Sequence, residues 1–317
     1  MAGMDGVLII DKPAGMTSHD VVAWVRKITG HRRVGHTGTL DPFATGVLVV
    51  LVGRATRLAQ FLSGAEKEYE AVIRLGYATD TGDVTGTRVP GFTPETQRST
   101  EIHREEIESA MASLRGEIEQ TPPMFSAKKV AGRKLYELAR RGEVIERQPV
   151  RVKISEFAAN AEGDAYLTDN EDGTRDLRVR VVCSAGTYIR TLAEDFGKKL
   201  GMGAHVAALR RTHAGQSRIG DAITLDRLNE VAKSGSVAEV LISPNAALSS
   251  LPALQLDADA ARRVSQGIDL QMIAADAWQW SNAQQVRLCN GAGKLIAVGI
   301  CDTEQMSIHP QVVIVTA

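Results

Sequence analysis

The sequence predicts an α+β protein, because stretches with a helical period and stretches with a strand period occur in one chain. Apolar residues between 18 and 30 recur at i, i+3, i+4 and i+7, the spacing of an amphipathic helix. Residues 67–77 alternate between apolar and polar, and residues 47–52 form an unbroken apolar run typical of a buried strand. The 317 residues are enough for about two domains.

Composition narrows the class of protein. Hydrophobic residues make up 44% of the chain and charged residues 24%, as in a globular protein with a real core. No run of about 18 apolar residues is present, so we expect no membrane span, and the first 15 residues lack the basic region of a signal peptide. The three cysteines are scattered and form no CxxC pair, which favours neither a zinc site nor a disulfide framework. We therefore expect a cytoplasmic protein.

Capping residues set the ends of the expected helices. Ser18 is placed to cap the first helix and Gly30 to end it. Thr187 and Thr224 are placed to cap two later helices. The expected helices cover residues 18–30, 54–62, 107–114, 135–141, 187–200 and 224–231, and a short one begins at Asp257.

Strands and connections follow from alternation and turn residues. Residues 161–176 are acidic and rich in turn formers, which predicts an exposed hairpin loop. Residues 237–252 are rich in Ser and Pro and are the expected linker to a last, β-rich part of the chain. The expected strands are residues 7–10, 47–52, 67–77, 177–183, 286–288, 295–300 and 312–315.

The chain is organised around residues 33–58, whose centre is Gly-His-Thr-Gly-Thr-Leu-Asp-Pro. Asp41 precedes Pro42, which biases it towards an extended or turn conformation. Gly35 and Gly38 allow a close backbone approach or a positive φ. The pattern predicts a carboxylate on a stiff loop at the mouth of a buried sheet, a common way to place a reactive group. An aspartate that merely opens a turn would have the same local pattern.

Charge is unevenly distributed although the net charge is only −1. Residues 124–153 contain nine Lys or Arg and three Glu, a local excess of +6. A basic segment of this kind suits a nucleic-acid contact. A solvated basic helix face is the alternative interpretation.

Several segments together resemble the TruB family of pseudouridine synthases. The sequence GHTGTLDPFATGVL at residues 35–48 is similar to the second motif of that family, GHxGxLDPxAxGxL. DKPAG at 11–15, KEYEAVIRLG at 67–76 and CSAGTYIRTLAEDFG at 183–197 resemble three further motifs, and 203–211 resembles the next element. The resemblance covers roughly residues 6–225.

The resemblance implies a specific architecture. Residues 1–236 would form a catalytic domain of pseudouridine-synthase type, with a mixed, mainly antiparallel sheet and flanking helices. An insertion at about 124–150 would clasp the RNA. Residues 252–317 would form a small, β-rich, PUA-like domain that binds RNA, an assignment that rests on position in the chain.

The resemblance also implies roles for particular residues. Asp41 would be the catalytic nucleophile, and Arg190 would pair with it. Tyr69 would stack on the target base, while His36 would enter the space that the base leaves. Other implied residues are Leu209, beside the base, Tyr188, which binds substrate, and Lys12, which supports the site. From charge and placement we expect RNA-backbone contacts at Arg54, Arg57, Lys128, Lys129, Arg133, Lys134, Arg210 and Arg211.

The implied activity is isomerisation of the uridine at position 55 in the tRNA T-loop, after base flipping. No atoms enter or leave, and the sequence has no GxGxxG, Walker loop or metal-ligand cluster, so we expect no cofactor and no metal. The expected partner is the T-arm stem-loop of tRNA, with no membrane, no obligatory protein partner and a monomeric chain. A tRNA-folding helper that acts independently of catalysis, or an RNA-guided ribonucleoprotein enzyme, are the alternatives. Whether Asp41 attacks C1′ or C6 stays open.

Overall fold

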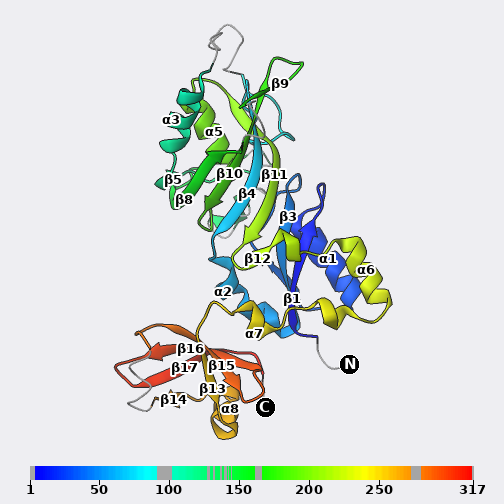
Figure 1. The fold of residues 1–317 in the computed structure, drawn as a ribbon, viewed down its shortest axis with the longest axis vertical. Helices are drawn as coiled ribbons and strands as arrows, with labels where there is room; N and C mark the ends of the chain where they lie inside the picture. Colours follow the sequence, from blue (N-terminus) through cyan, green and yellow to red (C-terminus); the bar gives the residue numbers. More distant parts are fainter. Residues whose placement is uncertain are drawn as a thin grey trace.

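The structure is a computed structural model that describes residues 4–90, 102–126, 145–160, 166–272 and 280–315, together with 129–130, 133–135, 138, 141 and 143. It confirms the predicted α+β class. A large sheet with flanking helices forms the upper and middle parts of the molecule in Figure 1, and a separate small sheet forms the lower part.

The large sheet has the strand order β1-β3-β11-β4-β10-β8-β5, with β2, β9 and β12 at its margins. Neighbouring strands are antiparallel except β3 and β11, which pair in parallel over only two residues. The strands are β1 (Gly6–Lys12), β2 (Val34–Thr37), β3 (Thr45–Val52), β4 (Lys67–Leu75), β5 (Gly116–Gln120), β8 (Val150–Ala159), β9 (Thr168–Asp169), β10 (Arg175–Cys183), β11 (Ala204–Ala214) and β12 (Ser217–Arg218). A two-stranded sheet pairs β6 (Lys129–Val130) with β7 (Arg133–Lys134).

Helices cover two regions of the large sheet. Helices α3 and α5 lie together over the part made by β4, β8 and β10, while α1 and α6 lie beside β1 and β2 (Figure 1). The helices are α1 (Ser18–Thr29), α2 (Ala59–Ser63), α3 (Arg104–Ala112), α5 (Ile189–Lys199), α6 (Leu225–Lys233) and α7 (Pro244–Ala247), with 3-10 turns η1 (Gly53–Leu58), η2 (Ile219–Asp221) and η3 (Val237–Val240). Of the predicted helix at 135–141, only residues 135, 138 and 141 are among those described.

Two predicted helix caps are wrong. Helix α1 is capped by Thr17, whose side chain forms a reciprocal capping box with Asp20. Ser18 is buried instead. Helix α5 starts after Tyr188, which forms no side-chain cap, and the hydroxyl of Thr187 donates to the carbonyl of Ser184. The predicted end at Gly30 and the cap at Thr224 are confirmed.

Alternation along the strands separates two faces of the large sheet. Tyr69, Ala71, Ile73 and Leu75 of β4 are buried in the core that also contains α5. Glu68 and Arg74 of the same strand form ion pairs on the other face, with Arg180 and Asp176 respectively. The apolar run of β3 is buried along nearly its whole length, as predicted.

The small sheet has the order β13-β15-β16-β17-β14 and packs against one helix. Its elements are β13 (Ala253–Leu256), α8 (Ala258–Ser265), β14 (Leu270–Gln271), β15 (Gln285–Asn290), β16 (Leu295–Asp302) and β17 (Ser307–Val313). The expected strand at 312–315 is therefore misplaced, since β17 begins earlier and ends at Val313. The segment 237–252, expected as a linker, contains η3 and α7 and leads into β13 of the small sheet. A shared apolar cluster that includes Leu58, Leu248 and Leu295 joins the two parts.

Candidate active site

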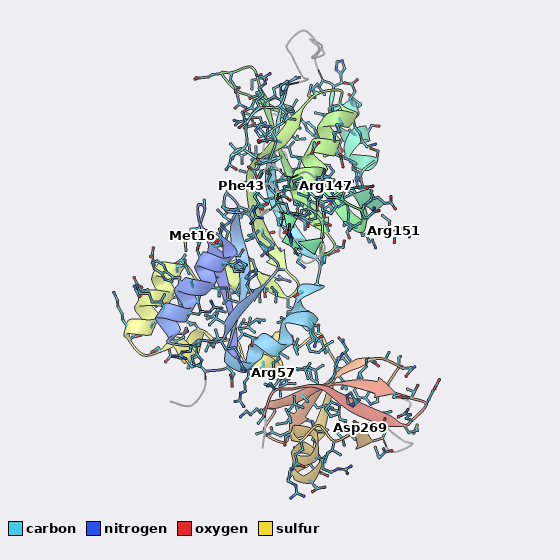
Figure 2. All side chains as sticks on the ribbon, turned by 180° about the vertical axis from the view of Figure 1, so that it is seen from behind. Met16, Phe43, Arg57, Arg147, Arg151 and Asp269 are labelled. Carbon is cyan, nitrogen blue, oxygen red and sulfur yellow. The ribbon has the colours of Figure 1, made fainter. Side chains whose placement is uncertain are left out.

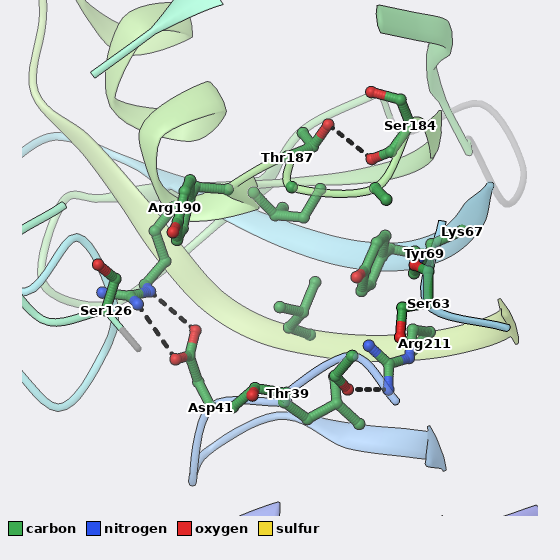
Figure 3. Close-up of a pocket in the computed structure, with 17 residues that line it drawn as sticks. Thr39, Asp41, Ser63, Lys67, Tyr69, Ser126, Ser184, Thr187, Arg190 and Arg211 are labelled. Atoms are coloured by element: carbon green, nitrogen blue, oxygen red, sulfur yellow. Dashed lines mark hydrogen bonds and ion pairs between the residues drawn. The ribbon is translucent and has the colours of Figure 1, made fainter. Parts of the chain in front are cut away.

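A cavity of about 270 Å³ opens between the loop that carries Asp41, strands β4 and β11, and the N-terminus of α5 (Figure 3). Ligand pockets for drug-sized molecules usually have about 300–1,000 Å³, so this one suits a single ring system. Its lining includes Gly38, Thr39, Leu40, Asp41, Ser63, Lys67, Tyr69, Ser126, Tyr188, Arg190, Leu209 and Arg211.

Asp41 and Arg190 form a two-pronged ion pair at one side of the cavity (Figure 3). Arg190 Nε donates to Oδ2 of Asp41 at 2.9 Å, and Nη2 donates to Oδ1 at 3.1 Å. The guanidinium also donates to the carbonyls of Thr81 and Phe125, both at 2.8 Å. With only 5% of its side chain exposed, Arg190 is held from three directions, whereas 33% of the Asp41 side chain is exposed. The carboxylate is thus oriented and remains accessible.

The electrostatics of Asp41 combine opposing effects. Burial raises the pKa of the carboxyl above its usual value, and the charge and hydrogen bonds of Arg190 act against this rise. Asp83, buried behind Arg190 with a carboxylate oxygen 3.8 Å from Nε, raises the pKa of Asp41 further. The result is an ionisable carboxylate whose charged form depends on its arginine partner.

Two buried side chains hold the loop around Asp41. The Lys12 ammonium donates to the carbonyls of Pro13, Met16 and Pro42. The Ser18 hydroxyl donates to the carbonyl of Leu40 and accepts its backbone N–H. Burial lowers the pKa of Lys12 to about 8, and the nearby Asp41 opposes that shift. The loop is therefore fixed on both sides of Asp41.

Three of the predicted substrate-binding residues line the cavity together. Tyr69 and Leu209 come from adjacent strands and are each 7% exposed, and Tyr188 precedes α5. The backbone of Tyr188 exchanges two hydrogen bonds with the side-chain amide of Gln120. Burial raises the pKa values of both tyrosines, so their hydroxyls stay protonated. Together they offer an aromatic and apolar surface.

His36 does not line this cavity. It lies in β2, where its backbone pairs with Val50, and its ring is 5.4 Å from that of His19. Its buried Nδ1 has no hydrogen-bond partner in the described structure. Burial lowers the pKa of His36 to about 4, so the ring is neutral.

Arg211 is positioned differently from its predicted role. Only 1% of the residue is exposed, and its guanidinium donates to the carbonyls of Val47 and Gly38 in the cavity wall. This position is inconsistent with a surface contact to the RNA backbone. The backbone of Gly46 approaches β11 so closely that a Cβ there would be 2.2 Å from the carbonyl oxygen of Arg211, which requires glycine.

The other predicted backbone contacts lie at several places. Arg54 pairs with Asp5, and Arg210 pairs with Asp11. Arg57 donates to the carbonyl of Val313, where the two parts of the molecule meet (Figure 2). Arg133 is exposed in β7. Lys128 and the side chains of Lys129 and Lys134 lie outside the described residues.

Sequence reasoning missed several residues of the site. Lys67 and Ser126 line the cavity, while Ser18, Asp83 and Gln120 support it. Lys67 stands in the motif that identified Tyr69, so it had a local signal. Ser18 and Gln120 had none, because their partners lie far away in the sequence.

The arrangement can support nucleophilic or general-base chemistry by a carboxylate on a planar ring. Among the described residues, no group of three or more metal-ligating side chains occurs. No helix in the described part of the chain is long and apolar enough to cross a membrane.

Comparison with known proteins gives consistent matches. The family model "TruB family pseudouridylate synthase (N terminal domain)" matches residues 26–189, and the model "tRNA pseudouridylate synthase B C-terminal domain" matches 190–249. The tRNA pseudouridine synthase B of Geobacillus thermodenitrificans is 45% identical over 271 residues, which is 86% of this chain and 87% of that protein. The protein of the same name from Bacillus anthracis is 44% identical over 268 residues, covering 84% and 85%.

Solved structures share the fold. The archaeal box H/ACA sRNP Nop10–Cbf5 complex contains a chain with a TM-score of 0.69 and 26% identity, covering 99% of this chain and 87% of that one. An H/ACA RNP bound to a substrate RNA containing 2′-deoxyuridine gives the same TM-score and identity, covering 98% and 85%.

Proposed function

Because this chain belongs to the TruB family of pseudouridylate synthases, we propose that it isomerises the uridine at position 55, in the T-loop of tRNA, with Asp41 as the nucleophile. The general activity, conversion of uridine to pseudouridine in tRNA, follows from the family and from relatives that match most of the chain. The position, the nucleophile and the roles of individual residues are our proposal.

The observation that supports Asp41 most is its ion pair with Arg190 at an open cavity. An opposite charge at hydrogen-bond distance favours the ionised carboxylate, and the two-pronged geometry fixes its direction. A carboxylate so held is suited to attack the sugar C1′ or the base C6, or to assist loss of the base. The Arg190 guanidinium donates hydrogen bonds to Asp41 and to the carbonyls of Thr81 and Phe125. Because its partners are protein groups, its proposed role is to position Asp41.

The rest of the cavity suits a flipped uracil. Flipping a base out of folded RNA costs a few kcal/mol, and stacking on an aromatic ring returns about 1–3 kcal/mol. Tyr69 supplies such a ring, and Leu209 and Tyr188 supply further walls. Loop residue Gly38 has φ +71°, which brings the backbone to the cavity without a side chain.

His36 is proposed to act outside the cavity, in the space that the flipped base vacates. The residue is partly exposed, while its Nδ1 is buried without a partner in the described structure. Lys12 is proposed to support the loop, as its three carbonyl contacts suggest.

Residues 1–236 are proposed as the catalytic domain and 252–317 as a PUA-like RNA-binding domain, in a cytoplasmic, monomeric protein that needs no cofactor. The segment 124–150 and Arg54, Arg57 and Arg210 are proposed to contact RNA phosphates. The solved neighbours are ribonucleoprotein components, but the 44–45% identity to tRNA pseudouridine synthases favours tRNA as substrate.

A direct test incubates the purified protein, treated with EDTA, with unmodified tRNA and maps pseudouridine at single-nucleotide resolution. The expected product is one pseudouridine, at position 55. A matched tRNA with cytidine at that position should gain none. Modification elsewhere, or a requirement for a guide RNA, would contradict the proposal.

A further inference from the structure

Two buried cations, Lys67 and Arg211, form the side of the cavity that lies across from the Asp41–Arg190 pair. Lys67 is 7% exposed and Arg211 1% exposed, and both line the cavity. Figure 3 shows Arg211, Lys67 and Tyr69 grouped together, with the Arg190 guanidinium and the Asp41 carboxylate on the opposite side. Both cations flank the loop, since a Cβ on Gly38 would be 3.4 Å from Arg211 Nη1 and 3.6 Å from Lys67 Cε.

Neither cation forms an ion pair within the described part of the chain. Lys67 donates to the carbonyls of Ser63 and Ala65, and Arg211 donates to those of Val47 and Gly38. On the open face of the same sheet, in contrast, arginines at 74, 180 and 210 all pair with carboxylates. Buried cations without a counter-charge are costly. The cavity therefore has an excess of positive charge on this side.

The proposed reaction places negative charge on the base. If Asp41 attacks C1′, the C1′–N1 bond breaks and its electron pair remains on the uracil ring. If Asp41 adds to C6, the electron pair of the C5–C6 bond moves into the ring and onto O4. In both cases the C1′–N1 bond is broken before C5 bonds to C1′, and the bond that Asp41 formed to C1′ or C6 then breaks and releases its carboxylate. C5 loses its proton and N1 gains one, so that no atom is gained or lost overall.

We propose that Lys67 and Arg211 stabilise the negative charge that develops on the uracil ring while it lies against Tyr69. The inference rests on the proposed function and adds two charge-stabilising residues to it. Fixed charges aimed at the site where charge develops need no reorganisation during the reaction. Two elements position them, since Lys67 begins β4 and Arg211 lies on the neighbouring strand β11.

Titration of Lys67 gives the inference a measurable consequence. Burial and, to a smaller extent, the charge of Arg211 lower the pKa of Lys67 to about 8, while Cys183 of β10 opposes the shift. Tyr69 on the same strand stays neutral, because burial raises its pKa. The Lys67 charge is present below its pKa and lost as the pH rises through it.

The first experiment measures single-turnover rates at saturating tRNA for Lys67→Met, which removes the charge at similar length. The rate should fall on the order of 100-fold, as when one charge-stabilising donor is removed from other enzymes, with unchanged tRNA affinity. A tRNA with 5-fluorouridine at the target should show a smaller fall, since fluorine already stabilises charge on the ring. For this tRNA the assay measures the loss of unreacted 5-fluorouridine, because its C5 carries fluorine and has no proton to release. Arg74→Gln, which breaks an ion pair at the other end of β4, is the control.

Equal falls in rate for uridine and 5-fluorouridine, or a decrease in tRNA affinity alone, would overturn the inference. Lys67→Arg provides a second test that keeps the charge. The wild-type rate should decline above about pH 8, and Lys67→Arg should move that decline to higher pH. The nearby Lys12 titrates in the same range but is unchanged in this variant. An unmoved decline contradicts the inference, whereas a wild-type protein that forms no pseudouridine contradicts the proposed function itself.

Discussion

Arg190 and Asp41 are separated by 149 residues in the sequence and are joined by two hydrogen bonds of 2.9 and 3.1 Å. Since the carbonyls of Thr81 and Phe125 hold the same guanidinium, four separate segments meet at this pair. The arginine is the fixed member and the carboxylate the accessible one. Catalysis should therefore require both a fixed arginine and an accessible carboxylate.

Asp41→Asn keeps the shape of the side chain and removes its negative charge. Pseudouridine formation should fall below detection in a tRNA assay, because an amide cannot serve as the nucleophile. Binding of tRNA should survive, since most contacts to RNA involve phosphates. Asp176→Asn, at an ion pair away from the cavity, is the control. Substantial turnover by a folded Asp41→Asn protein would remove the central assignment.

The decline in rate at acidic pH should reflect protonation of the Asp41 carboxylate. Burial raises the pKa of this carboxyl, and only its ionised form is nucleophilic. The single-turnover rate should therefore fall as the pH decreases, at a higher pH than for an exposed aspartate with a pKa of about 3.9. Arg190→Lys removes the two-pronged ion pair that opposes the rise, so the decline should move to still higher pH. If the rate declines at the same acidic pH in both proteins, Arg190 does not control the ionisation of Asp41.

Tyr69 offers two separable properties, a ring and a hydroxyl. Tyr69→Phe should reduce the single-turnover rate only modestly if stacking is its main contribution, and Tyr69→Ala should remove a further stacking energy of about 1–3 kcal/mol. Rates of both variants at saturating tRNA distinguish the two properties. A near-complete loss of activity in Tyr69→Phe would assign the hydroxyl to proton transfer.

The basic segment is expected to bind phosphates directly. Neutralising Lys128, Lys129, Arg133 and Lys134 together should weaken tRNA binding. The slope of log K against log salt should also decrease by roughly 0.7–0.9 for each phosphate interaction that the substitutions remove. Binding measured over a range of salt concentrations gives this slope. If the slope is unchanged, these charges face solvent.

The C-terminal unit is expected to increase tRNA affinity without taking part in the chemistry, because all proposed catalytic and cavity residues precede it. A chain ending at Leu251 would expose Leu58 and Leu248 of the shared apolar cluster, so the test chain also contains Leu248→Gln for solubility. Its tRNA affinity should be weaker, with the single-turnover rate at saturating tRNA retained. A folded truncated chain without activity would show that the unit supports the active site.

Local patterns were sufficient for much of the fold. The periods of the first helix, of β3 and of β4 depend on residues a few positions apart, and these elements are where they were expected. Helix caps were less secure. Thr17 and Ser18 can both cap a helix, and only the distant Leu40, which binds the Ser18 hydroxyl, decides between them. The short helix α7 inside the expected linker was not predicted, because Ser and Pro occur both in irregular connections and at the start of helices.

The sequence by itself was enough to identify the family motifs, the loop that carries Asp41 and the residues expected to lie near that carboxylate, because each motif is contiguous in the chain. Only the tertiary structure decided which charges are buried and what they face. Arg210 and Arg211 are neighbours in one strand, yet the first pairs with Asp11 on the open face of the sheet and the second lies in the cavity wall. Successive side chains of a strand point to opposite faces, and which of those faces is covered depends on segments more than a hundred residues away.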